Sequence, residues 1–425
     1  MNFLYITALD FLTISIIIKL DLERGVAMSA THVKNMQFLR KSNRATIIKH
    51  LATQGPSSRI ELSSQLGLTK MAVSNIVAEM IEEKLITESG LLTNGQDKKS
   101  PSSGRKRTAL SLLPYSINGI AIWITRFQLH CLAIEITGQI FCHLCKEIPQ
   151  NADNQFVVRT LCAMISNILE IHSDKNFIGI GIASIGPLDI QQKKLLAPPN
   201  FYEIKDLEIG RILEEQFQCP VFLDNDMNGI ALAEQLYGIG KEMTDLVYVG
   251  FGSGVGAGII ANGKILHGRG GYAGELGHVS INPEGERCSC GQRGCLELYT
   301  GLSTFLKNCN VNSIKELRRK MEANPVPELI SNNLLAFQRA VQKALISVAN
   351  LFDPEIIIVG DQMLPMMIPM LPEIEAYMNT HMFHHGFRNI KLVQSSFGSR
   401  APLIGAGAIL FQKIFSSEIS IPSNN

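Results

Sequence analysis

One histidine and three cysteines lie close together in the sequence, at spacings that suit a metal ion. His278 ends the segment Gly274-Glu275-Leu276-Gly277-His278, and Cys288, Cys290 and Cys295 complete a set that spans eighteen positions. An imidazole with three thiolates matches a tetrahedral zinc site, and the glycines allow the loop to fold tightly. All four ligands would be protein atoms, so we predict a structural Zn²⁺ ion that activates no water; unrelated free thiols in a loop are the alternative.

A second group of sulfur and imidazole side chains, Cys142-His143-Leu144-Cys145, suits a metal less well. It falls where a strand is expected, and neighbours on a strand point to opposite faces, so packing explains it better. The chain has nine cysteines in all. An odd count without secretory features argues against a disulfide framework and predicts a reducing, cytoplasmic compartment.

The run Asp224-Asn225-Asp226-Met227-Asn228 follows the apolar Val221–Leu223 and precedes a predicted helix. An Asn225–Asp226 pair at a strand end can bind sugar hydroxyls, because amide and carboxylate together donate and accept hydrogen bonds. In a kinase such an aspartate would be the general base that deprotonates the attacking hydroxyl. Taken alone, the run is also typical of a helix-capping turn. Further hydroxyl contacts could come from Glu275, His278 and Glu297, which flank the zinc loop.

Glycines alternate with other residues from Gly250 to Gly258, directly after a predicted strand. Such a segment lets backbone N–H groups approach a phosphate closely. A glycine-rich β-hairpin with a purely structural role fits the same residues, so both interpretations stay open.

The N-terminal part of the chain is basic. Thirteen lysines and arginines oppose six acidic residues between Met28 and Leu110, a net charge of +7 within a chain of net charge +1. Helical patterns on either side of Gly67, with Thr69 as N-cap of the second helix, indicate a helix-turn-helix. The second helix would enter the DNA major groove, and a small helical interaction domain with a basic surface is the alternative. The predicted DNA contacts are Lys70, Met71, Ser74, Asn75, and, in a wing, Arg105, Lys106 and Arg107.

After about Ser111 the sequence alternates strand and helix patterns, which predicts an α/β body with ligand chemistry at the carboxyl ends of strands. We expect two similar halves. Predicted strands are 118–124, 129–135, 177–183, 220–223, 246–251 and 355–359, and predicted helices are 158–172, 207–217, 227–237 and 333–352. The domain boundaries that follow are 28–110 for a winged helix-turn-helix with its wing and linker, and 111–425 for the body, with the zinc loop at 274–297.

Residues 1–27 contain the apolar run Phe11–Leu20, which is too short to span a membrane and lacks the basic region and cleavage site of a signal peptide. We expect native translation to start at Met28 and residues 1–27 to be non-native or disordered. The intact mass of the natively expressed protein tests this.

Together these motifs resemble the ROK family of repressors and sugar kinases, in particular its N-acetylglucosamine and xylose repressor branch. The resemblance extends from about Asn35 to Lys413 and includes Pro354–Gly360 and Gly405-Ala406-Gly407. It implies an actin-like ATPase (ribonuclease H-like) fold of two α/β lobes. By position, it assigns sugar contacts to Asn225, Asp226, Glu275, His278 and Glu297, and zinc ligands to His278, Cys288, Cys290 and Cys295.

The sequence departs from the kinases of that family where they carry Asp-x-Gly-x-Thr, the turn that surrounds the ATP phosphates. The corresponding residues are Ile122-Trp123-Ile124-Thr125-Arg126-Phe127, with no aspartate or glycine, and Asp361 replaces a glycine common after Gly360. Bulky side chains remove the close backbone approach that a phosphate needs. We therefore predict a vestigial base at Asp226 and no catalysis.

The resemblance implies a repressor of carbohydrate uptake or catabolism genes that binds inverted-repeat operators as a homodimer or homotetramer. Its effector would be a sugar or a sugar phosphate, which would change lobe or subunit orientation and weaken operator binding. Two alternatives stay open: a bifunctional ATP-dependent sugar kinase with a DNA-binding head, and a repressor controlled by a phosphotransferase-system protein. The motifs do not determine which sugar is sensed.

Overall fold

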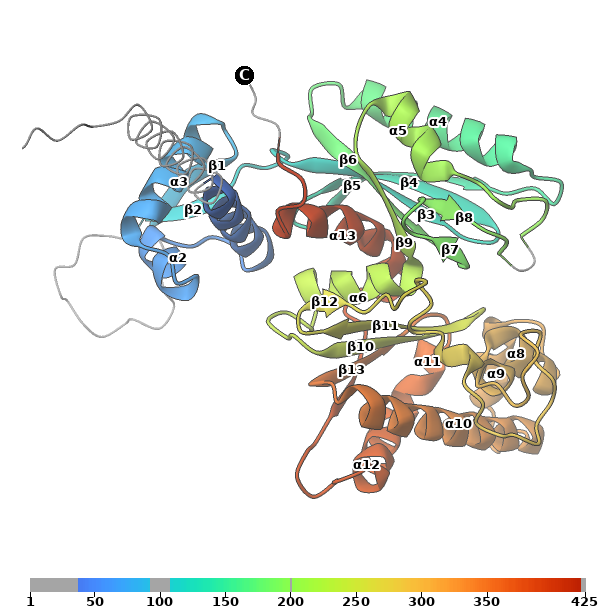
Figure 1. Ribbon diagram of the computed structural model, residues 1–425. Coiled ribbons are helices and arrows are strands. Elements are labelled where there is room, and N and C mark those ends of the chain that lie inside the picture. The colour runs from blue at the N-terminus through green and yellow to red at the C-terminus, as the bar shows by residue number, and fades with distance from the viewer. Residues whose placement is uncertain (1–36, 92–107, 199–200, 422–425) are drawn as a thin grey trace, which may run out of the picture. The chain divides into compact units, whose positions relative to one another are not determined.

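The computed structural model describes residues 37–91, 108–198 and 201–421. These residues form two compact units (Figure 1). The first contains the described residues up to Leu113 and those from Lys413 onward, and the second is Pro114–Gln412. The predicted N-terminal extension and the predicted wing residues Arg105, Lys106 and Arg107 lie outside the described residues. No helix within the described ranges is long and apolar enough to cross a membrane.

The first unit consists of short helices and a two-stranded sheet. A helix that includes residues 37–53 precedes α2 (Arg59–Gln65) and α3 (Lys70–Glu82), and β1 (Ile86–Leu91) pairs antiparallel with β2 (Thr108–Leu112). Gly67 has φ +64° in the turn between α2 and α3, a conformation that glycine adopts without strain. Thr69 caps α3 by accepting a hydrogen bond from the N–H of Ala72, as predicted. The apolar sides of the helices form a core of Ile47, Ile48, Leu51, Leu62, Val73, Ile76, Val77 and Met80.

The second unit begins with a five-stranded sheet in the order β5-β4-β3-β6-β9. Alternate side chains of its strands pack with α4 and α5 into one apolar cluster. The opposite face of the sheet lies against α13, because Leu410 of that helix meets Gly119 of β3 and Gly181 of β6. The bounds are β3 (Asn118–Ile124), β4 (Gln128–Glu135), β5 (Ile140–Glu147), α4 (Asn154–Ile171), β6 (Phe177–Ser184), β7 (Leu188–Asp189), β8 (Lys194–Leu195), α5 (Ile209–Phe217), β9 (Val221–Asn225) and α13 (Ala401–Phe415).

A second five-stranded sheet has the order β12-β11-β10-β13-β14. In both sheets three successive strands pair antiparallel and two later strands add in parallel, so the expected pair of similar halves is confirmed at the level of topology. The bounds are α6 (Asp226–Tyr237), β10 (Leu246–Phe251), β11 (Val255–Ala261), β12 (Lys264–Ile265), α7 (Glu297–Thr300), α8 (Leu302–Asn308), α9 (Ile314–Met321), α10 (Glu328–Phe352), β13 (Ile356–Gly360), α11 (Leu364–Met367), α12 (Leu371–His381) and β14 (Lys391–Gln394).

Helices α6 and α13 approach each other at a pair of glycines. A Cβ atom placed on Gly405 of α13 would lie 2.7 Å from the carbonyl carbon of Gly229 in α6. Such a contact does not occur between real side chains and backbone, so any larger residue at Gly405 would push the helices apart. The glycine pair therefore sets the spacing between the helix on the first sheet and the helix that begins at Asp226.

Candidate effector site and metal centre

The Asp224–Asn228 run lies where β9 ends and α6 begins. Asn225 is the N-cap of α6, and its Oδ1 accepts a hydrogen bond of 2.9 Å from the N–H of Met227. Asp226 is the first residue of the helix, and its Oδ1 accepts from the same N–H, also at 2.9 Å. The capping interpretation of the run is therefore correct for Asn225. The cap uses only the amide oxygen of Asn225. The amide nitrogen Nδ2 remains able to bind a ligand, and it lies near Gly186, where an added Cβ would be 3.7 Å from it.

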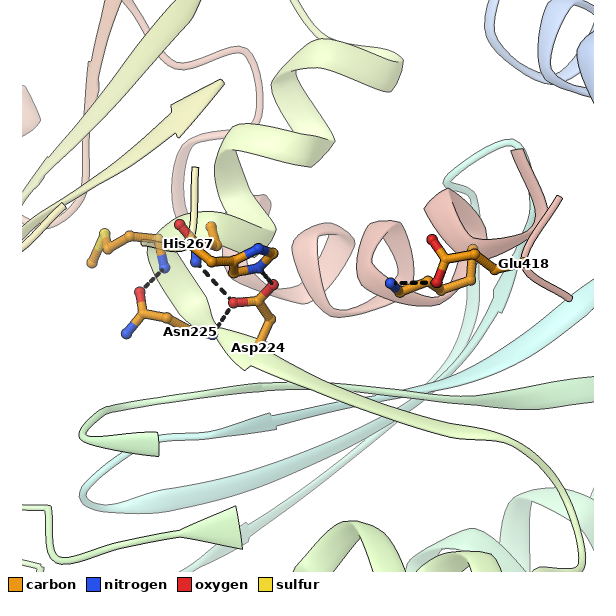
Figure 2. A network of polar contacts seen from close by, with 7 residues as sticks. Asp224, Asn225, His267 and Glu418 are labelled. Atoms are coloured by element: carbon orange, nitrogen blue, oxygen red, sulfur yellow. Dashed lines mark hydrogen bonds and ion pairs between the residues drawn. The ribbon is translucent and has the colours of Figure 1, made fainter. Parts of the chain in front are cut away.

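A buried carboxylate connects this helix start to the segment after β12. Asp224 accepts hydrogen bonds from Asn228 Nδ2 at 2.8 Å and pairs with His267 Nε2 at 2.7 Å (Figure 2). His267 was not predicted from the sequence, because it lies 43 positions from its partner and in no recognisable motif. The contact fixes the beginning of the zinc-loop segment beside the polar end of β9.

Asp226 is buried close to a second carboxylate and an indole. Its pKa is raised to about 7, first by burial and then by the charge of Asp361, against the opposing effects of the Met227 N–H and the Trp123 side chain. The pKa of Asp361 is also raised, chiefly by its own burial. No lysine, arginine or histidine within the described ranges contributes to either shift. The two acids therefore share a site that disfavours additional negative charge.

Strand β11 brings the zinc loop to the same region. A Cβ placed on Gly258 would meet the carbonyl oxygen of Met227 in α6 at 2.2 Å, and one on Gly274 would meet the carbonyl oxygen of Ala257 at 2.0 Å. The glycine-rich segment thus forms an antiparallel β10–β11 hairpin, in which glycines permit close packing of α6 and of the loop. The predicted hairpin is therefore present, and its glycines have a packing role.

The predicted sugar contacts on the zinc-loop side lie near one another. Glu297 Oε2 accepts a hydrogen bond of 3.0 Å from the N–H of Val255 at the start of β11. Burial raises the pKa of Glu275, the neighbouring His278 lowers it, and the charge of Glu297 raises it again. Glu275, His278 and Glu297 therefore interact electrostatically, and β11 joins them to the helix that carries Asp226.

The four predicted metal ligands come together. Their ligand atoms all lie within 4.8 Å of one another; Cys288 Sγ is 3.7 Å from His278 Nδ1, and Cys290 Sγ is 3.5 Å from Cys295 Sγ. A tetrahedral zinc ion with its usual bond lengths requires about 3.8 Å between two sulfurs and about 3.6 Å between sulfur and nitrogen. The cluster could therefore hold a metal of zinc's size with little rearrangement.

The electrostatics of the cluster favour thiolate at one position. Burial raises the pKa of Cys288, but hydrogen bonds from the Cys290 backbone, His278 and the other thiols outweigh it, and the pKa falls to about 7. Burial and the neighbouring sulfurs raise the pKa of Cys295 to about 12. Thiolate is the form that binds metal, so the cluster is prepared for a cation that would deprotonate the remaining thiols.

The other sulfur and imidazole group lies on β5, as expected. His143 Nε2 contacts His130 Nδ1 at 3.0 Å, and the rings stack with centroids 5.3 Å apart. Cys142 and Cys145 do not belong to any metal-type cluster among the described residues.

The predicted DNA-contacting residues of α3 share one exposed face. Lys70, Ser74 and Asn75 are exposed, opposite the buried Val73, Ile76 and Val77. Met71 belongs to the apolar pattern of the helix, yet 76% of its surface is exposed on the same side as Lys70. An exposed methionine among polar groups suits contact with an apolar base edge better than a core position.

The two-lobed body is found in solved structures of sugar kinases and of a transcriptional regulator, which have the actin-like ATPase fold. A ROK hexokinase from Thermus thermophilus is 25% identical, with a TM-score of 0.60, and covers 69% of this chain and 97% of its own. A ROK family transcriptional regulator, described as a homologue of the E. coli MLC protein, is 26% identical with a TM-score of 0.74, and covers 89% of this chain and 97% of its own.

The ROK family pattern matches residues 120–413, and the chain belongs to the ROK family. Among its relatives, the xylose repressor of Bacillus spizizenii is 27% identical over 389 residues, which cover 89% of this chain and 97% of the repressor. The DNA-binding transcriptional dual regulator NagC of Escherichia coli is 25% identical, over 89% of this chain and 94% of that protein.

Proposed function

We propose that the chain is a sugar-responsive transcriptional repressor of carbohydrate genes. The observation that carries the proposal is the combination of a complete polar site with an altered phosphate turn. Asp226 lies beside Trp123. Trp123 belongs to the stretch that, by the family resemblance, corresponds to the phosphate loop of the kinases. The relatives that share 89% of the chain's length are named as repressors or regulators, whereas the ROK hexokinase covers 69% of it.

The body, residues 111–425 in this proposal, binds the effector. Hydroxyl groups of the sugar contact Asn225, Asp226, Glu275, His278 and Glu297, and none of these residues performs catalysis. Zn²⁺ held by His278, Cys288, Cys290 and Cys295 is structural. Since Nδ1 of His278 is the atom directed at Cys288, the other ring nitrogen remains for a hydroxyl group.

The head, residues 28–110, is a winged helix-turn-helix in this proposal, with α3 in the major groove and the β1–β2 pair as the base of the wing. A homodimer or homotetramer binds two half-sites of an inverted repeat. Effector binding changes the orientation of the heads, which requires that the sugar bind more tightly to one orientation than to the other. The coupling free energy between effector binding and operator binding in such proteins is about 1–3 kcal/mol.

The effector site is tested by operator release. A panel of pentoses, hexoses and aminosugars is added to the protein–operator complex, and the operator Kd is measured by fluorescence anisotropy. We expect one sugar to weaken binding by about 5- to 150-fold, and Asp226→Ala to abolish that effect while leaving the sugar-free Kd unchanged. Asp174→Asn, on an exposed loop, is the matched control. ATP-dependent turnover of a sugar that disappears in Asp226→Asn would instead establish the kinase alternative.

The DNA contacts are tested on α3. Asn75→Ala removes a side chain that can bind adenine by two hydrogen bonds, so it should relax base preference at one position by about 1–3 kcal/mol. Lys70→Ala should weaken binding to all sequences and flatten the salt dependence if Lys70 contacts phosphate. Lys343→Ala, exposed on α10 of the body, controls for the loss of one positive charge. Equal effects of Asn75→Ala on operator and scrambled DNA would refute the groove assignment.

A further inference from the structure

The side chain of Trp123 fills the space at the end of β3 beside Asp226. It lies on the sheet face opposite the buried Ile122 and Ile124, and its Nε1 is buried with no acceptor within hydrogen-bonding distance among the described residues. The indole lowers the pKa of Asp226 and so favours its charged form, which places the ring close to that carboxylate. A bulky ring therefore lies next to the acid that would meet a sugar hydroxyl.

Neighbouring rings fix the position of the indole. Trp123 stacks on His130 of β4, with centroids 4.8 Å apart and an interplanar angle of 23°. His130 in turn stacks on His143 of β5 and contacts it through ring nitrogens at 3.0 Å. His130 is 8% exposed, so the middle ring of the stack is shielded from water, whereas His143 at its outer end is exposed. Because these rings come from three neighbouring strands and pack on one another, moving the indole aside for a larger ligand would cost packing energy.

A carboxylate occupies the opposite side of the same region. Asp361 follows β13 with φ +74°, so it keeps a backbone conformation that suits glycine while adding a charged side chain. That side chain lies against Gly252 in the β10–β11 turn, where an added Cβ would be 2.0 Å from Asp361 Oδ2. A hydrogen bond of 3.1 Å between Ser253 Oγ and Gln362 Oε1 joins the two turns. The glycine-rich turn is thus closed by an acid rather than open to an anion.

We propose that the effector is a free, uncharged sugar, and that Trp123 and Asp361 exclude sugar phosphates, the indole by its volume and the carboxylate by its charge. This inference rests on the proposed function and narrows its ligand class. A hydroxyl group can donate to Asp226 and accept from the indole N–H. A phosphate on that hydroxyl carries about −1.5 to −2 charges and would face two buried carboxylates, whose pKa values no lysine, arginine or histidine among the described residues lowers.

The test compares matched pairs of ligands on the full-length, zinc-loaded protein. Isothermal titration calorimetry is run with glucose and glucose 6-phosphate, N-acetylglucosamine and its 6-phosphate, and xylose and its 5-phosphate. We expect at least one free sugar to bind, and its phosphate to bind about 100-fold more weakly. Asp361→Asn, which keeps the shape and removes the charge, should reduce this ratio by about 10-fold, and Asp174→Asn should not change it.

Arg126 provides the competing outcome, because it lies in the turn after β3 and forms no ion pair with a described residue. A phosphate that binds as tightly as its free sugar, and loses that affinity in Arg126→Ala, would overturn the inference and leave the proposed function intact. An unchanged ratio in Asp361→Asn also contradicts it. If no sugar of either kind binds or alters the operator Kd, the proposed function fails, and the inference fails with it.

Discussion

A protein in which serine replaces Cys290 is expected to lose its metal and its response to the effector together. Serine is a poor zinc ligand, so only His278, Cys288 and Cys295 would remain to bind the ion. Three ligands bind a structural zinc ion too weakly to retain it in the presence of a chelator. The loop that carries His278 would lose its cross-link, and Glu297 follows the last cysteine directly. Zinc content should fall from about one ion per chain to near zero, and sugar should no longer change the operator Kd.

DNA binding without sugar should survive this change, because α3 lies in the other compact unit. Cys145→Ser is the matched control: it removes an exposed thiol from β5 and should alter neither zinc content nor sugar response. Zinc content is measured by mass spectrometry after dialysis against a chelator. A Cys290→Ser protein that holds no metal yet releases operator on adding sugar would refute the link between the metal and the effector site.

The second large effect is expected at Glu234, whose side chain is fully buried near the end of α6. Its carboxylate accepts hydrogen bonds from Ser395 Oγ at 2.7 Å, from the Ser396 N–H at 2.8 Å and from Ser396 Oγ at 2.7 Å. Glu234→Ala would leave these donors without an acceptor, which costs about 3–4 kcal/mol. For a unit of this size, Tm should fall by about 6–8 °C.

Calorimetry or circular dichroism measures the change. Glu234→Gln should have an intermediate effect, because the amide oxygen can accept from Ser395 while its NH₂ group faces further donors. Glu170→Ala, at an exposed position of α4, should change Tm by no more than about 1 °C. A Tm loss at Glu234→Ala as small as that control would show that the carboxylate does not anchor α6.

Local patterns predicted much of this molecule. The strands at 118–124 and 246–251 have the predicted bounds, and the metal ligands could be found because they lie within one loop. Periodicity alone would also allow Met71 a core position, and its predicted DNA contact depended instead on its place in the first turn of the second helix. In the structure 76% of its surface is exposed, which agrees with that placement.

Long-range polar contacts were not predicted. His267 meets Asp224 across 43 positions, and Glu234 meets Ser395 across 161. The sequence predicted that bulky residues such as Trp123 replace a phosphate loop, but not that the indole would lie beside Asp226. Such contacts depend on how the sheets and helices pack against one another, and the periodicity of hydrophobic residues along the sequence does not predict them.

The glycine contact between α6 and α13 has a consequence for how sequences of this kind can diverge. Residues in the turns after β3 and β13, such as Arg126 and Asp361, lie outside the helices and strands, so a substitution there changes the polar site without adding a side chain to a helix crossing. Gly229 and Gly405 allow no such freedom, because any side chain at Gly405 meets backbone at 2.7 Å. Turn residues can therefore diverge one at a time, whereas a change at this helix crossing would first have to be compensated on both helices.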